Sequence, residues 1–176
     1  MKLFKSITHI SLIALFPYFL LFCAGVNQLI AANASQKINL TDFYSALQSQ
    51  DTIKLNSFLH ILEHDSTTSS RAYTGALLMK KSSMQKSLNN KLSMFKQGKT
   101  LLEDAIKKEN KNAEFHFLRL IIQENCPSFL KYQNNIKEDA DTVKQMYKKI
   151  SPTLKQAVLD YSKTSKTLKA DELSKL

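Results

Sequence analysis

Residues 112–127 read NAEFHFLRLIIQENCP, and they indicate the fold of this chain more clearly than any other stretch. Asn112 is suited to start a helix, and Pro127 ends one, because its ring clashes with the preceding turn and it has no N–H to donate. The apolar residues between them have helical spacing and cover more than one face: Phe115, Phe117, Leu118, Leu120, Ile121 and Ile122. We therefore predict a helix here that is buried on most sides.

Apolar stripes with helical spacing continue on both sides of this stretch. In the set Leu55, Phe58, Leu59 and Leu62, for example, apolar residues fall three and four apart. Outside residues 1–34 the chain has only two glycines and two prolines, too few turn formers for a sheet-rich domain. We predict an all-α protein, an irregular antiparallel bundle or array of about seven helices, near residues 41–47, 51–64, 70–83, 91–108, 112–126, 135–150 and 151–163.

Small and aromatic residues predict how some of these helices meet. Gly75, with Ala76, lies in one predicted helix and Gly98 in the next, and at each of these places another helix could approach closely. Phe129, Leu130 and Tyr132 follow the end of the central helix. We expect these three side chains to fold back as an apolar plug under the helix ends.

The centre of the chain carries a degenerate repeat signal. Residues 101–114 look like the second helix and turn of a tetratricopeptide unit, with Asn110 where proline is usual. The spacing between the helix at Tyr73 and the helix at Gly98 and Ala105 exceeds the usual period of that repeat. We therefore expect at most about one and a half units, in a bundle that borrows the helix-pair geometry.

Further short strings extend this likeness: RAYTGA at 71–76, FKQG at 95–98, LEDAI at 102–106, EFHFLRL at 114–120 and QENCPSFL at 123–130. As a set they resemble a family of small exported bacterial proteins that are all-helical, tetratricopeptide-like and of unknown function. The likeness covers residues 71–150. It implies a fold and a compartment, and it transfers no catalytic residue.

The N-terminus has the pattern of a secretory signal peptide. Lys2 and Lys5 precede an apolar run over residues 10–23, and the stretch closes on Ala32-Asn33-Ala34. We predict a signal peptide at 1–34, a single helical domain at 35–165 and a frayed lysine-rich tail at 166–176. The protein would then be exported, to the periplasm or beyond. A retained membrane anchor is the alternative, because residues 7–36 carry no charge and about 20 apolar residues span a bilayer.

The net charge of the chain and its distribution indicate which classes of partner it could bind. Without residues 1–34 it has 23 basic and 15 acidic residues, a net charge of +8. Only two of the basic residues are arginines and the lysines are dispersed, which argues against nucleic-acid binding. Attraction to an anionic membrane or envelope polymer, through the lysines of residues 163–175, stays open. Cys126 is the one cysteine after residue 34, so we expect no internal disulfide and an inert, half-buried thiol.

One string has the spacing of a catalytic motif. His60, Glu63 and His64 match the H-x-x-E-H pattern of inverted zinc proteases, in which two histidines bind the metal and the glutamate acts as base. Two polar histidines near a helix end are the structural alternative. The sequence contains no nucleophile elbow, phosphate loop or dinucleotide fingerprint. We therefore expect a protein that is not an enzyme and that has neither a cofactor nor a metal site; His60, Glu63 and His64 are the candidate ligands if a metal does bind.

The strongly apolar central helix also carries polar residues, and we predict that Arg119, Glu114 and Gln123 form a structural polar clamp. A buried arginine needs a charged partner. We expect a carboxylate on a neighbouring helix to pair with it, and the choices are Glu103, Glu138 and Asp139. An anionic ligand bound at Arg119 is the alternative.

The leading functional hypothesis is a non-catalytic protein-binding or scaffold module of the bacterial cell envelope, with an unknown protein partner. It predicts a groove lined by exposed aromatic residues and lysines. The alternatives are a small zinc-dependent hydrolase that uses the His60 motif, and electrostatic docking to an anionic membrane or polymer.

Overall fold

The computed structural model describes residues 38–176, and within that range it contains helices and no strand. The prediction of an all-α helical array is therefore confirmed. There are eight α-helices and one 3-10 helix in this part of the chain: α2 (Leu40–Gln48), α3 (Thr52–Leu62), α4 (Thr68–Ser82), α5 (Leu88–Lys108), α6 (Ala113–Asn125), η1 (Ser128–Leu130), α7 (Ile136–Met146), α8 (Pro152–Ser162) and α9 (Ala170–Leu173). The predicted signal peptide, residues 1–34, lies outside the described residues.

Short polar side chains start several of these helices. Asn39, Asp51 and Asn112 each accept hydrogen bonds from backbone N–H groups in the first turns of α2, α3 and α6. The Ser151 hydroxyl accepts from the Leu154 N–H at 3.2 Å in α8. These bonds satisfy N–H groups that have no partner inside the helix, which is why the helix starts are readable from sequence.

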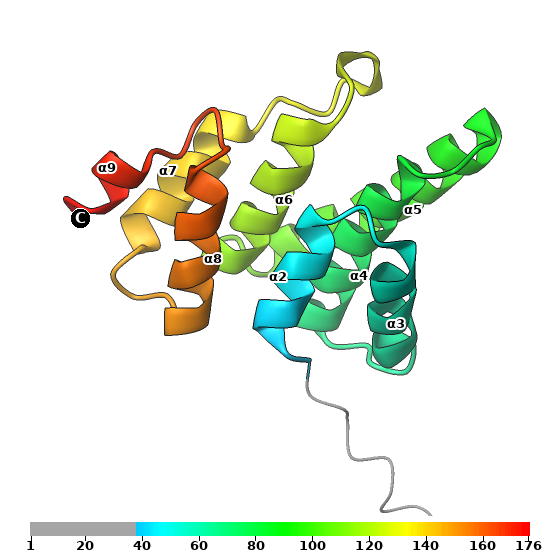
Figure 1. Cartoon of the computed structure of the whole chain (residues 1–176), viewed down its shortest axis with the longest axis horizontal. Helices are drawn as coiled ribbons and strands as arrows, with labels where there is room; N and C mark the ends of the chain where they lie inside the picture. Colours follow the sequence, from blue (N-terminus) through cyan, green and yellow to red (C-terminus); the bar gives the residue numbers. More distant parts are fainter. Residues whose placement is uncertain (1–37) are drawn as a thin grey trace, which may run out of the picture. The chain divides into compact units, whose positions relative to one another are not determined.

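The helix α6 occupies the centre of the array. It contacts α4 and α5 on one side and α7 on the other (Figure 1). Phe117, on α6, is fully buried and places its ring 5.8 Å from that of Tyr44 on α2 and 5.7 Å from that of Tyr161 on α8. Since α2 also contacts α8, helices from near the two ends of the described residues meet beside the central one.

The helices α4 and α5 pack through glycine. A β-carbon added to Gly75 would lie 2.7 Å from the Gly98 carbonyl oxygen and 2.8 Å from the Leu102 nitrogen. No real side chain tolerates such distances, so the predicted close approach is confirmed. The finer prediction of a tetratricopeptide-like pairing stays a prediction.

The C-terminal residues differ from expectation. The sequence predicts a frayed tail at residues 166–176, but Leu168 and Leu173 have exposed fractions of 0% and 2% and belong to the core. Glu172 accepts a hydrogen bond from Lys144 of α7 at 2.5 Å. The domain therefore extends to α9, because two apolar side chains anchor an otherwise polar segment.

The predicted plug is correct only in part. Tyr132 is buried and Leu130 is half-buried, but Phe129 is 68% exposed. Phe129 and Leu130 are in the short helix η1, whereas Tyr132 follows it beyond Lys131, whose backbone is left-handed with a φ of 49°. Among residues 38–176, no helix is long and apolar enough to cross a membrane.

Candidate functional site

The H-x-x-E-H residues lie on an open surface. The helix α3 ends at Leu62, so His64 lies in the following turn and not on the helix. The side chains of His60 and Glu63 are 81% and 62% exposed, with 3.3 Å between His60 Nδ1 and Glu63 Oε2. Residues 38–176 contain no group of three or more His, Cys, Asp or Glu side chains placed to hold a metal ion.

Arg119 lies at the centre of a buried ionic cluster. Its Nε donates to Asp139 Oδ2 at 2.8 Å and its Nη2 to Asp139 Oδ1 at 2.7 Å, a two-pronged pair. Its Nη1 donates to Glu103 Oε2 at 2.8 Å. Asp139 is on α7 and Glu103 on α5, so Arg119 ties α6 to both neighbours. The third candidate carboxylate is that of Glu138; its Oε2 lies 3.8 Å from Arg119 Nη2, and its side chain is mostly exposed.

His116 belongs to the same cluster, although it was not among the site residues predicted from the sequence. Its Nδ1 lies 2.6 Å from Asp139 Oδ1 and its Nε2 lies 2.9 Å from the Asn110 carbonyl oxygen. Both partners only accept hydrogen bonds, so both ring nitrogens must carry a proton and the ring is an imidazolium. Burial lowers the pKa of His116, but the bonds to Asp139 and Asn110 outweigh burial and raise it above 6.5. The sequence signal that could have identified His116 is its position one helical turn before Arg119, which places the two side chains on the same face.

The other two members of the predicted clamp lie elsewhere. Glu114 accepts hydrogen bonds from the hydroxyls of Tyr73, at 3.0 Å, and Tyr44, and so links α6 to α4 and α2. Burial, with the charge of Glu114, raises the pKa of both tyrosines. Gln123 is fully buried, and its amide oxygen and nitrogen have no hydrogen-bond partner among residues 38–176. The three residues therefore do not act as one unit.

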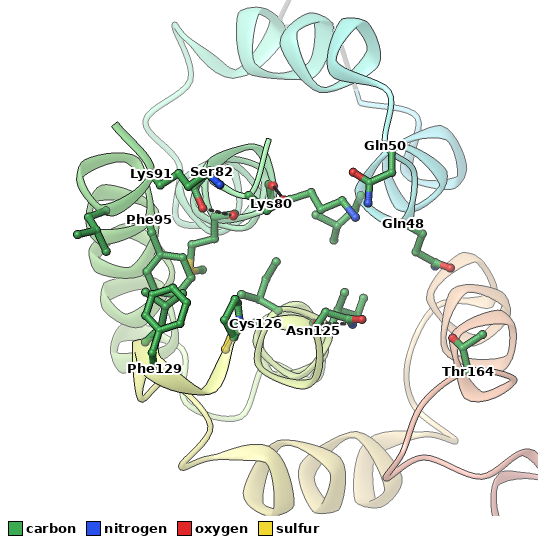
Figure 2. Close-up of a pocket in the computed structure, with 18 of the residues that line it drawn as sticks. Gln48, Gln50, Lys80, Ser82, Lys91, Phe95, Asn125, Cys126, Phe129 and Thr164 are labelled. Carbon is green, nitrogen blue, oxygen red and sulfur yellow. Dashed lines mark hydrogen bonds between the residues drawn. The ribbon is translucent and has the colours of Figure 1, made fainter. Parts of the chain in front are cut away.

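One end of the array contains a pocket of about 600 Å³. Helix ends from α2, α4, α6 and α8 surround it, together with η1 and the start of α5 (Figure 2). Its walls are mainly apolar and include Leu47, Met79, Phe95, Ile121, Ile122 and Tyr161. We call this site the apolar pocket. A volume of this size is typical of ligand-binding clefts.

Exposed apolar side chains gather at the rim of the apolar pocket. Five large apolar residues are exposed in the described part of the chain, and three of them line this pocket. They are Leu88, 61% exposed, Leu92, 43% exposed, and Phe129, 68% exposed. Exposed apolar side chains that line the same pocket are typical of a binding site.

The charged lining of the apolar pocket has one sign. Lys80 and Lys91 line it, whereas no aspartate or glutamate does. Neither lysine forms an ion pair within residues 38–176. Figure 2 shows both on the side of the pocket opposite Cys126 and Asn125. Burial lowers the pKa of Lys80, since its ammonium group is partly removed from water.

Cys126 also lines the apolar pocket. Its thiol lies 3.5 Å from the Gln123 carbonyl oxygen and 3.6 Å from the Tyr132 carbonyl oxygen, and it donates toward these acceptors. Burial raises the pKa of the thiol. A thiol that is protonated and directed at carbonyl groups is a poor nucleophile.

The chain matches no protein-family model, no curated protein and no solved structure. The likeness that the strings of residues 71–150 carry therefore stays an expectation, and a proposal for the function rests on the site itself.

Proposed function

We propose that this protein is a non-catalytic binding module that holds a segment of a partner polypeptide in the apolar pocket. The observation that carries the proposal is the concentration of Leu88, Leu92 and Phe129 on the rim of one pocket. Exposed apolar side chains cost free energy in water, and a partner that covers them recovers it.

The geometry favours a polypeptide over a small ligand. A small apolar molecule inside the pocket would contact Met79, Phe95 and Ile122, and would leave most of Phe129 and Leu88 in water. A peptide can place one bulky side chain in the pocket and lay its backbone across the rim. Anchors of this kind, surrounded by less buried contacts, supply most of the binding energy in protein interfaces.

The proposal includes export to the bacterial cell envelope. Its support is the signal pattern of residues 1–34 and the family likeness of residues 71–150. A binding role rather than catalysis is supported by the buried polar groups, since Arg119, Asp139 and His116 are committed to one another and none of them lines the pocket.

The test is affinity capture from a cell-envelope extract with a matched pair of variants. The double variant Leu88→Ser/Phe129→Ser removes two rim side chains that are already exposed, so folding should be retained. Ile53→Ser is the control, because Ile53 is 77% exposed and does not line the pocket. We expect a partner that wild type and Ile53→Ser capture and the double variant loses. Equal capture by all three proteins would exclude the apolar pocket as the binding site.

A further inference from the structure

The two lysines of the apolar pocket lie at opposite kinds of helix end, which carry partial charges of opposite sign. Lys80 lies in the last turn of α4, where a positive charge complements the partial negative charge of the helix end. Lys91 lies in the first turn of α5, where the helix end is itself partly positive. Dipole complementarity therefore accounts for Lys80 and not for Lys91.

The start of α5 is short of negative charge in other ways. Its N-cap residue, Ser87, makes no side-chain capping bond, and its first turn contains no acidic residue. The helices α2, α3, α4, α6 and α8 each have a side-chain cap, and α7 and α9, which lack one, have acidic residues in their first turns. Leu88 and Lys91 both belong to this first turn, and both line the apolar pocket.

The pocket also receives partial negative charge from helix C-terminal ends, but some of the carbonyl groups there already accept hydrogen bonds. The C-terminal ends of α2, α4, α6 and α8 reach the pocket and carry partial negative charge. Their carbonyl groups accept hydrogen bonds: that of Lys80 from the Ser83 hydroxyl at 2.8 Å, and that of Cys126 from the Gln133 amide at 3.2 Å. The dipole effect also falls off within one turn, whereas the two ammonium groups are full charges.

We propose that the partner segment is acidic, with a carboxylate paired to Lys91 at the start of α5, a second one near Lys80, and a bulky apolar side chain in the apolar pocket. This inference rests on the proposed function and specifies its partner. The pocket presents two positive charges, no negative side chain and an apolar floor, and the complementary ligand has the reverse charge around an apolar anchor. A carboxylate near Lys80 would offset the cost of removing its ammonium group from water. A carboxylate at the start of α5 would supply the hydrogen-bond acceptor that the missing cap does not.

Two other occupants fit the charges less well. A second copy of this chain, related by a two-fold axis, would bring the same face and its lysines against themselves. A single-chain amphiphile with one anionic group could pair with one lysine but would leave the exposed side chains of the rim uncovered.

The test is selection from a library of short random peptides displayed on phage. The targets are wild type, the charge-reversed variant Lys80→Glu/Lys91→Glu, and the control Lys54→Glu/Lys166→Glu, whose two lysines are exposed and do not line the pocket. We expect wild type and the control to enrich peptides with Asp or Glu beside Phe, Leu, Met or Trp. The charge-reversed variant should bind those peptides about tenfold or more weakly and select basic residues in their place.

A selected peptide should also slow the modification of Cys126 by a thiol reagent, because that thiol lines the pocket. Thermal unfolding of each variant distinguishes loss of binding from loss of fold. If pocket-binding peptides emerge without an acidic bias, or are insensitive to charge reversal, this inference is wrong and the proposed function stands. If no peptide is enriched and only dodecanoate, a single-chain anionic amphiphile, protects Cys126, this inference and the proposed function are both wrong. If sedimentation shows a dimer that Leu92→Ser dissociates, the occupant is a second copy, and both are again wrong.

Discussion

The Gly75 carbonyl oxygen occupies the space that a side chain at Gly98 would need, since a β-carbon added to Gly98 would lie only 2.5 Å from that oxygen. That β-carbon would also lie 2.9 Å from the backbone nitrogen of Met79. Both obstacles belong to the backbone of α4, so a rotamer change cannot remove them. The distance between α4 and α5 is therefore set by the absence of a side chain at residue 98.

The substitution Gly98→Ala should destabilise the domain. Alanine normally stabilises a helix interior relative to glycine by about 1 kcal/mol. Here the methyl group must force α4 and α5 apart, and overpacking of this kind costs about 1–3 kcal/mol. Ser93→Ala, at an exposed position of the same helix, is the control and should be neutral or slightly stabilising. Urea unfolding of both variants measures the difference, and a more stable Gly98→Ala protein would show that the two helices are not in contact there.

Removing Arg119 should have a larger effect. The variant Arg119→Met keeps much of the side-chain volume but leaves Asp139, which is fully buried, without its guanidinium partner. Breaking one side of a buried pair costs about 3–5 kcal/mol. Lys137→Met is the matched control, because Lys137 pairs with Asp141 in water, where such pairs contribute little. If the two variants unfold at the same urea concentration, the ionic cluster is not a structural element.

Local patterns predicted most of the helices. A cap is a bond between residues two or three apart, and an apolar stripe repeats every three or four, so α2, α3, α6 and α8 begin where the sequence indicates. The glycines of α4 and α5 were each predicted as sites of close approach for a similarly local reason, because a glycine on an apolar helix face leaves room for a neighbouring backbone. That the two sites face each other is a finding of the structure.

What the sequence left open depends on residues that are far apart along the chain. The spacing of Arg119 could not choose among Glu103, Glu138 and Asp139, because that choice depends on how α5 and α7 are placed and rotated against α6. Leu168 has no apolar stripe around it, so nothing local predicted its burial. The apolar pocket is assembled from the ends of separate helices, so its place could not be predicted; of the exposed aromatic residues and lysines expected in a groove, its lining contains Phe129, Lys80 and Lys91.

The charge of His116 should make stability depend on pH. The folded protein holds the pKa of His116 above 6.5, so its contribution is fully present below about pH 6.5 and is lost as the pH rises through the raised pKa. The free energy of unfolding of wild type should therefore fall over that range, and His116→Gln should lack this component. His64→Gln, at an exposed histidine, is the control and should keep it. A proton NMR titration that places the pKa of His116 below 6.5 would contradict the imidazolium assignment.

The C-terminal segment should detach when Glu124 loses its charge. Glu124 accepts hydrogen bonds from the Tyr161 hydroxyl at 2.6 Å, the Ser165 hydroxyl at 2.8 Å and the Thr167 N–H at 2.9 Å. Burial raises the pKa of Glu124, but these three bonds outweigh burial and lower it below 4.5. The anchoring is therefore present above about pH 4.5 and is lost as the pH falls through the lowered pKa.

The variant Glu124→Gln exchanges one acceptor oxygen for an NH₂ group and removes the charge that strengthens all three bonds. Bonds to a charged group contribute about 1.5–3 kcal/mol, so at neutral pH trypsin should cleave after Lys166 and Lys169 about tenfold faster or more in this variant. Glu63→Gln, at an exposed position far from residue 124 along the chain, should match wild type. Rapid cleavage of wild type at these lysines would instead support a frayed tail, since Leu168 and Leu173 protect the segment only while they are buried.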